Sequence, residues 1–260
     1  MKKGSQRSRG YSVFSDNFRD ALKGSVFNIE DLGYVQSTNN RDAVMRGIRG
    51  SVDDFTNGPL ETLNYVSCHD NNTLWDRIDL SLKEEPFANK VKMAKLANAV
   101  VLTSQGVPFL HAGEEFLRTK NGEDNSYNLS DDINRLDWTR KKEHRAVFEY
   151  YRALIALRKA HPVFRMKTEE AVRANLKFYD ELGLAVDRPA IAYVLYGDAA
   201  GDSWSRAAVL INPHKTPLKF VLPEGDWRQA LDEGGLYSGP DAAITGAFEV
   251  PPLSLAVLYR

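Results

Sequence analysis

The 260-residue chain has a formal net charge of −1 and a single cysteine. The balanced charge gives no global field that would favour nucleic acid or an anionic membrane surface, and one cysteine excludes an internal disulfide framework. No apolar run approaches the ~20 residues needed to span a bilayer. We therefore expect neither a nucleic-acid partner nor a membrane segment.

Up to about residue 163, short apolar strands alternate with helical patterns. Strands are expected at 11–14, 60–67 and 107–110, and helices at 16–24, 38–50, 87–104 and 142–160. Strand and helix in alternation are typical of parallel βα units. The polar stretch 118–137 is longer than a connection requires, which indicates a functional loop.

After residue 163 the pattern changes to short apolar segments separated by turns rich in Gly, Pro, Asp and Asn. These segments are 190–196, 206–211, 217–222, 246–250 and 254–259. Strands at this spacing predict an antiparallel β-sandwich. The expected fold class is therefore α/β over residues 1–163 plus all-β over residues 164–260.

One stretch carries most of the chemical signal. Residues 63–76 read Leu-Asn-Tyr-Val-Ser-Cys-His-Asp-Asn-Asn-Thr-Leu-Trp-Asp, an apolar strand that ends in the polar cluster His69, Asp70 and Asn71. Polar side chains at the carboxyl end of a barrel strand lie in the loops that face substrate. For the His-Asp dipeptide alone, a capped loop is the better explanation. The whole run, however, resembles type I pullulanases, the α-1,6 debranching enzymes of the α-amylase superfamily.

Two further regions resemble the same family. Residues 106–116, Gly-Val-Pro-Phe-Leu-His-Ala-Gly-Glu-Glu-Phe, resemble its eighth strand. Glu114 and Glu115 there are either an acid/base couple or, as we favour, anchors for loops at the barrel top. His111 is expected to pack in the barrel top.

The polar loop from residue 120 to residue 138 resembles the pullulanase sequence Asn-Ser-Tyr-Asn … Ile-Asn-x-Leu-Asp-Trp. Amides, carboxylates and an aromatic ring suit glucan recognition, so candidate sugar contacts are Asn125, Tyr127, Asn128 and Arg135. The alternative is that this loop caps itself through Asx-turns.

The resemblance implies a retaining glycoside hydrolase on a (β/α)8 TIM barrel, followed by a small β-sandwich. It places the three expected strands as the sixth, seventh and eighth of that barrel. Retaining enzymes use two carboxyl groups ~5–5.5 Å apart, which the family carries after its fourth and fifth strands. Only its third carboxylate maps onto this chain, as Asp70, a transition-state stabiliser, with His69 and Asn71 binding the same sugar. We therefore expect the isolated chain to be inactive.

The resemblance also bears on partners. The basic start has no apolar segment behind it, so it does not predict a signal peptide, and residues 10–28 resemble an interior pullulanase segment. We expect the open barrel to need its N-terminal half, or a self-association partner, beside the α-glucan substrate. No cofactor is expected. Asp131 and Asp132 lack the spacing of a calcium site, so no metal is expected either.

Three alternatives remain. Within the enzyme class, the chain could come from an isoamylase or a glycogen-debranching relative. From a different class, it could be a non-catalytic α-glucan-binding module. It could also be an interaction module whose exposed barrel edges bind a partner.

Overall fold

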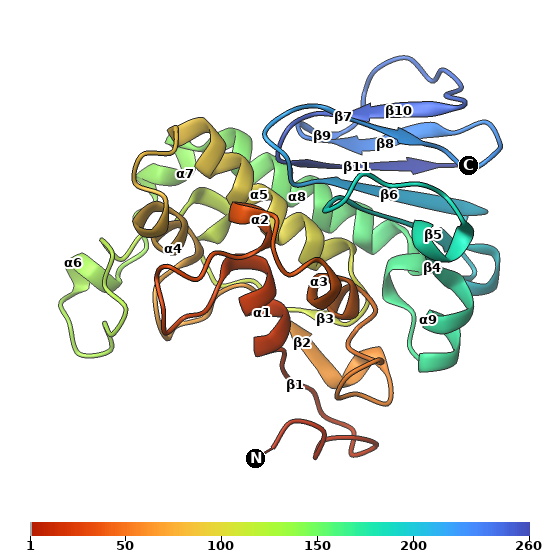
Figure 1. Cartoon of the computed structure of the whole chain (residues 1–260). Coiled ribbons are helices and arrows are strands. Elements are labelled where there is room, and N and C mark those ends of the chain that lie inside the picture. Colours follow the sequence, from red (N-terminus) through yellow and green to blue (C-terminus); the bar gives the residue numbers. More distant parts are fainter. Residues whose placement is uncertain (1) are drawn as a thin grey trace.

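The computed structural model describes residues 2–260, and its first part combines a small parallel sheet with helices (Figure 1). The sheet has the order β1-β2-β3, from β1 (Val13–Phe14), β2 (Thr62–Asn64) and β3 (Val107–Pro108). The helices are α1 (Asp16–Lys23), α2 (Tyr34–Ser37), α3 (Arg41–Ile48), α4 (Leu74–Ser81), α5 (Phe87–Thr103), α6 (Asp131–Asn134), α7 (Thr139–Glu143) and α8 (Arg145–Ala160). None of the helices in residues 2–260 is both long and apolar enough to cross a membrane.

The two longest helices follow from their apolar patterns. Helix α8 buries Val147, Tyr150, Leu154 and Leu157 along one face, as the sequence predicted. Helix α5 is apolar nearly all round, and it is buried continuously from Leu96 to its end. A helix of that kind belongs inside a protein, and Figure 1 shows α5 and α8 running between the small parallel sheet and the C-terminal strands.

Several expected boundaries were wrong for local reasons. The helix expected at 38–50 begins only at Arg41, because Thr38 and Asn40 have φ near +67° and +66° and cannot continue a right-handed helix. The strand expected at 60–67 is limited to Thr62–Asn64, since a 3-10 turn occupies Pro59–Glu61. Helix α4 was not expected, although the Thr73 side chain caps it by accepting from the Asp76 N–H at 3.1 Å.

The C-terminal part contains α9 (Glu169–Asn175) and two antiparallel sheets. Its strands are β4 (Leu176–Phe178), β5 (Ile191–Tyr196), β6 (Arg206–Asn212), β7 (Leu218–Val221), β8 (Arg228–Asp232), β9 (Gly235–Leu236), β10 (Ala247–Val250) and β11 (Ser254–Tyr259). Six strands form one sheet in the order β4-β5-β6-β11-β8-β9, and β7 pairs with β10. The chain is therefore a mixed helix and sheet protein with antiparallel sheets.

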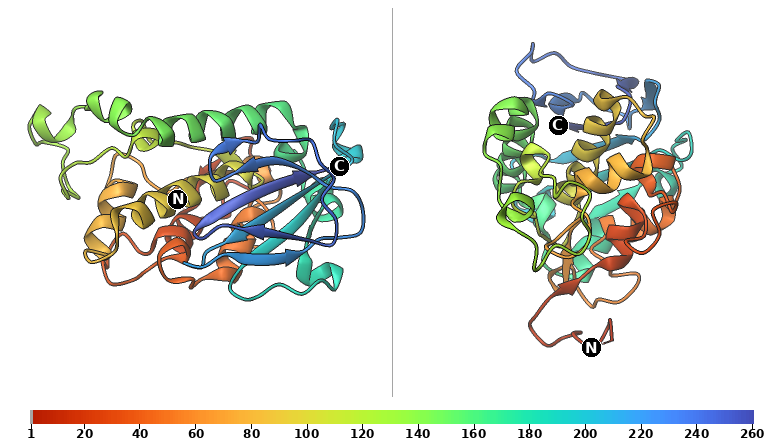
Figure 2. Two further views of the ribbon diagram at one scale, coloured as in Figure 1. Left: turned by 90° about the horizontal axis from the view of Figure 1, so that it is seen from above. Right: turned by 90° about the vertical axis from the view of Figure 1, so that its left-hand side faces the viewer.

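The large sheet is covered on both faces, because alternate residues of a strand point to opposite sides. Tyr193, Val209 and Val257 belong to the core shared with α5 and α8. Their neighbours Val194 and Leu258 belong to a second core, which Phe220 of β7 and Val250 of β10 complete. Figure 2 shows the large sheet beside the helices from two further directions.

Direct bonds join the segments on either side of residue 163. The buried Gln105 side chain donates to the Val163 carbonyl and accepts from the Met166 N–H, both at 2.9 Å. The Arg41 guanidinium binds both carboxylate oxygens of Asp180 at 3.1 Å. The larger apolar core draws residues from both segments, so the C-terminal sheet forms part of the support beneath the parallel strands.

Candidate functional site

The carboxyl ends of β1, β2 and β3 meet at one edge of the parallel sheet, because all three strands run in the same direction. The segment after β2 carries His69 and Asp70, and the segment after β3 carries His111 and Glu115. In βα proteins this is the edge where ligands bind. Residues more than forty positions apart are thus brought to one side of the molecule.

His69 and Asp70 lie together and open to solvent. Their side chains are 86% and 73% exposed, and the His69 Nε2 atom is 3.3 Å from the Asp70 Oδ1 atom. The next residue, Asn71, has φ +63°, a left-handed conformation that Asn tolerates better than most residues. The pair offers an imidazole and a carboxylate that a ligand can reach from solvent.

A buried carboxylate connects the loop carrying this pair to the long polar loop. Asp76 is 4% exposed and accepts from the Thr119 hydroxyl and, at 2.7 Å, from the Lys120 N–H. The Lys120 ammonium in turn donates to the His69 carbonyl oxygen at 3.3 Å. Through these bonds, Asp76 and Lys120 together fix the backbone at His69.

A second buried network lies beneath the strand ends. Glu114 accepts from the Ser67 hydroxyl and from the Asn98 amide at 3.1 Å, and the same amide reaches the Tyr151 hydroxyl at 2.7 Å. Burial raises the pKa of Glu114 to about 7, although the hydrogen bonds from Ser67 and Asn98 oppose that shift. Because Ser67 is two residues from His69, this network anchors the same loop from the β3 side.

Glu114 is therefore an anchor, as favoured from the sequence. Its partners are the side chains of Ser67, which follows β2, and of Asn98 in α5. Glu115 accepts the Gly113 N–H at 2.9 Å and so holds the backbone of its own turn. The buried Lys23 at the end of α1 adds a positive charge near Glu114. Burial lowers the pKa of Lys23 to about 7.

His111 is held in one protonation state. Burial, with the positive charge of Arg118 second, lowers the pKa of His111 to about 4. The imidazole is then neutral at pH 7, and its Nε2 atom lies 3.1 Å from the Arg118 Nη1 donor. His111 therefore acts as a fixed acceptor for Arg118 in the packed strand end.

The candidate contacts of the long loop are exposed and lie apart from this pair. Asn125, Tyr127, Asn128 and Arg135 are all open to solvent, Tyr127 by 83%. Figures 1 and 2 show the segment around α6 extending away from the body of the protein. Within residues 2–260 these four side chains have no hydrogen bond or ion pair with His69 or Asp70. Their segment instead closes on itself through Ser126 and Asn134, which form two hydrogen bonds of 2.9 and 2.7 Å.

Sequence reasoning missed the supporting residues. Asp76 has a local signal, because it follows the N-cap Thr73 by three positions. Asn98 also has one, since a polar side chain in the middle of an apolar helix needs a buried partner. No three His, Cys, Asp or Glu side chains in the described chain, residues 2–260, are grouped so that they could hold a metal ion.

Comparisons with known proteins agree with this picture. The family model "Pullulanase, all-beta domain" matches residues 172–235. The pullulanase of Bacillus subtilis is 35% identical over 97% of this chain and 35% of its own length. The Flavobacterium isoamylase is 27% identical over 92% of this chain and 36% of its own length.

Solved structures match as well. The pullulanase from Bacillus acidopullulyticus superposes with a TM-score of 0.94 at 41% identity, covering 100% of this chain and 32% of that one. The Bacillus subtilis type I pullulanase complexed with maltose has a TM-score of 0.89 at 36% identity, covering 95% of this chain and 35% of that one. The chain thus spans about a third of the length of the relatives it matches.

These matches relate the chain to the debranching glycoside hydrolases, the pullulanases and isoamylases. Within that class the chain belongs to the pullulanases and corresponds to the C-terminal part of a type I pullulanase. The resemblance drawn from residues 63–76 and 120–138 is confirmed.

Proposed function

We propose that this chain supplies one wall of a cleft that hydrolyses α-1,6-glucosidic bonds in pullulan, starch or glycogen with retention. The main support for this proposal is the exposed His69–Asp70 pair, which follows the carboxyl end of β2. The backbone of the pair is anchored by the buried Lys120, which binds the His69 carbonyl oxygen. Asp70 accepts sugar hydroxyls and stabilises the oxocarbenium-like transition state. His69 and Asn71 bind the same glucose unit.

The exposed loop extends that surface in this proposal. Asn125, Tyr127, Asn128 and Arg135 contact more distant glucose units, Tyr127 with its ring and the others with hydrogen bonds. The maltose-bound Bacillus subtilis pullulanase supports an α-glucan as the ligand. The α-glucan is thus the proposed substrate.

The proposal assigns β1, β2 and β3 as the sixth, seventh and eighth strands of a TIM barrel spanning residues 1–163, with residues 164–260 as the β-sandwich domain. A retaining mechanism requires a nucleophile and an acid/base group ~5–5.5 Å apart. Neither maps onto this chain. The isolated chain is therefore inactive, and the catalytic pair comes from other strands.

The remaining strands of the barrel could pair with the free edges of the three-stranded sheet. Strands β1 and β3 are the outer strands of the sheet, and each pairs only with β2 among the described residues. An unpaired strand edge presents N–H and C=O groups that another strand can bind. On β1, the Phe14 ring is 39% exposed although it contacts the Tyr65 and Phe109 rings.

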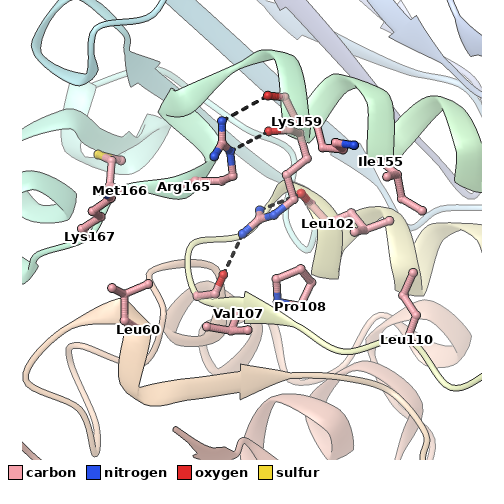
Figure 3. A pocket seen from close by; sticks show the side chains of 12 residues that line it. Leu60, Leu102, Val107, Pro108, Leu110, Ile155, Lys159, Arg165, Met166 and Lys167 are labelled. Carbon is pink, nitrogen blue, oxygen red and sulfur yellow. Dashed lines mark hydrogen bonds between the residues drawn. The ribbon is translucent and has the colours of Figure 1, made fainter. Parts of the chain in front are cut away.

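An apolar cavity of about 450 Å³ lies beside β3 (Figure 3). Leu60, Val107, Pro108, Leu110 and Ile155 give it an apolar wall, and Lys159, Arg165 and Lys167 also border it. Apolar surface left in water costs about 25 cal/mol per Å², so this wall favours contact with further apolar residues. The proposed partner is the N-terminal half of the barrel or, without it, a second copy of this chain.

The floor of this cavity is already fixed. Arg158 donates to the carbonyl oxygens of Leu102, Ser104 and Gly106 at 2.7–2.9 Å. A partner would therefore meet a surface that needs little rearrangement.

Light scattering of the isolated chain tests whether it self-associates. At about 10 μM, above the micromolar affinities typical of weak complexes, the isolated chain should form dimers or larger species. A substitution that places a charge on the edge, Phe14→Lys, should shift it toward monomer. A well-behaved wild-type monomer would refute this part of the proposal.

Reducing-end assays test the activity. The purified chain should release no reducing ends from pullulan above the buffer blank, and clear turnover would show that its own residues supply the chemistry. Isoamylase-type debranching is the second candidate, because an isoamylase matches most of the chain. Rates on pullulan against glycogen, measured with a completed barrel, separate the two.

A further inference from the structure

We propose that the chain carries a second α-glucan binding site, remote from Asp70, where the end of α8 meets the edge of the six-stranded sheet. A cavity of about 370 Å³ opens there. Its polar and aromatic lining consists of His161, Trp204, Gln229, Tyr237 and Tyr259. The choice of ligand rests on the proposed function, whereas the site rests on its own geometry.

The aromatic lining is a continuous stack. The rings of His161 and Trp204 lie nearly parallel with centroids 3.3 Å apart, and those of Trp204 and Tyr259 with centroids 4.6 Å apart. Tyr237 is 37% exposed, and its neighbour Leu236 is 51% exposed. Within this aromatic wall both faces of the Trp204 ring are therefore covered, and the exposed Tyr237 is the ring that a ligand can reach from solvent.

A buried carboxylate fixes this wall. The Asp202 side chain is 0% exposed and lies 2.8 Å from the His161 Nδ1 atom. It also accepts the Val163 N–H and the Trp204 N–H, both at 3.0 Å. One carboxylate thus fixes the His161 ring and the backbone at Trp204, so the start of the stack is preorganised.

Polar groups on the lining remain available for a ligand. With Nδ1 engaged by Asp202, the His161 Nε2 atom has no hydrogen-bond partner among residues 2–260. Gln229 uses its Nε2 atom to bind the Asp232 carboxylate at 3.0 Å, which leaves its carbonyl oxygen free. These groups can accept hydrogen bonds from hydroxyls at the rim of the aromatic wall.

The lining selects for a neutral polyhydroxylated ligand. No Lys, Arg, Asp or Glu side chain lines the cavity, so it offers nothing to a phosphate or an acidic peptide. Small-molecule sites combine an apolar surface with a few placed polar groups. A pyranose matches this, because its C–H face packs on an aromatic ring while its hydroxyls reach His161 and Gln229.

A substitution at Gly239 offers a way to move the Tyr237 side chain while keeping the tyrosine in place. A Cβ atom added at Gly239 would lie 2.3 Å from the Tyr237 hydroxyl oxygen, so the tyrosine side chain would have to move. The clash involves only the far end of one side chain. Gly239→Ala is therefore a variant that shifts the aromatic wall and preserves the fold.

The test is a tryptophan-fluorescence titration of the whole chain with β-cyclodextrin, an α-1,4-glucan ring. Saturable binding is expected, and cellohexaose, a β-1,4-glucan, should give none. Tyr237→Ala should weaken binding about tenfold, an energy of about 1.4 kcal/mol. Gly239→Ala should also weaken binding, whereas Tyr237→Phe should stay within about twofold of the wild type, which is about 0.4 kcal/mol. Trp204→Phe should remove most of the fluorescence change.

Controls separate this site from the proposed cleft. Phe27→Ala removes a 90% exposed ring elsewhere and should leave binding unchanged. His69→Ala should also leave it unchanged. Absence of binding by the wild type, or binding that survives both Tyr237→Ala and Gly239→Ala, would overturn this inference. Loss with His69→Ala alone would overturn it too, while still supporting the cleft at Asp70.

Discussion

Two polar regions of the protein differ in how their side chains are used. Near the strand ends, Asp76 and Glu114 are buried, and their carboxylate oxygens accept hydrogen bonds from distant parts of the chain. In the loop around α6, Tyr127 and its neighbours are exposed and make few contacts. The buried groups of the first region hold the loop that carries His69 and Asp70, whereas the side chains of the second region are themselves exposed to a ligand. Substitutions should therefore lower the free energy of unfolding in the first region and weaken ligand binding in the second.

The largest effect should come from the pH dependence of Glu114. Its folded-state pKa is raised to about 7 from an ordinary 4.5, so its contribution to stability is present in full below about 4.5 and is lost as pH rises to about 7. The loss amounts to up to about 3 kcal/mol. Lys23, with a pKa lowered to about 7, stays charged in both states through most of this range.

Urea unfolding at pH 5 and pH 7.5 measures this effect. Glu114→Gln cannot titrate, so its stability should change less between the two pH values than that of the wild type. Equal changes in both proteins would show that Glu114 keeps an ordinary pKa.

A smaller effect is expected from Asp76→Ala. The change leaves the Lys120 N–H and the Thr119 hydroxyl without their acceptor, which should cost about 1–3 kcal/mol. The matched control is Asp79→Ala in the same helix, whose partly exposed ion pair with Lys90 should contribute less than about 1 kcal/mol. Similar urea midpoints for the two variants would argue against Asp76 as the connection between the loops.

The smallest effect on stability is expected from Tyr127→Ala. An 83% exposed ring with few contacts should change the free energy of unfolding by less than about 0.5 kcal/mol. A loss above about 1 kcal/mol would place Tyr127 among the supporting residues and remove the contrast between the two regions.

The strands and helices that sequence reasoning found have strong apolar patterns. Helix α8 and strands β5, β6 and β11 were expected close to their observed bounds, because their apolar residues pack in a core: one face of α8 and nearly all of each strand. Strand β8 (Arg-Gln-Ala-Leu-Asp) was missed, since only Leu231 of its residues is fully buried. Local sequence does not show that such a strand pairs with β11.

The site divides in a similar way. The position of His69 and Asp70 after an apolar strand could be predicted, because it is a local feature of residues 63–76. The anchors depend on tertiary contacts: Ser67 meets Glu114 from 47 positions away, and Asp76 meets Lys120 from 44. Such pairs become visible only when the strand ends are brought together.

The proposed role of Asp70 as a transition-state stabiliser can be measured directly in a completed barrel. The barrel-forming part of the Bacillus subtilis pullulanase would be fused ahead of residues 2–260 and assayed on pullulan, with and without Asp70→Asn. We expect the fusion to hydrolyse pullulan and Asp70→Asn to lower the rate at least about 100-fold, as for the loss of a transition-state contact. An Asp70→Asn fusion as fast as its parent would contradict this role.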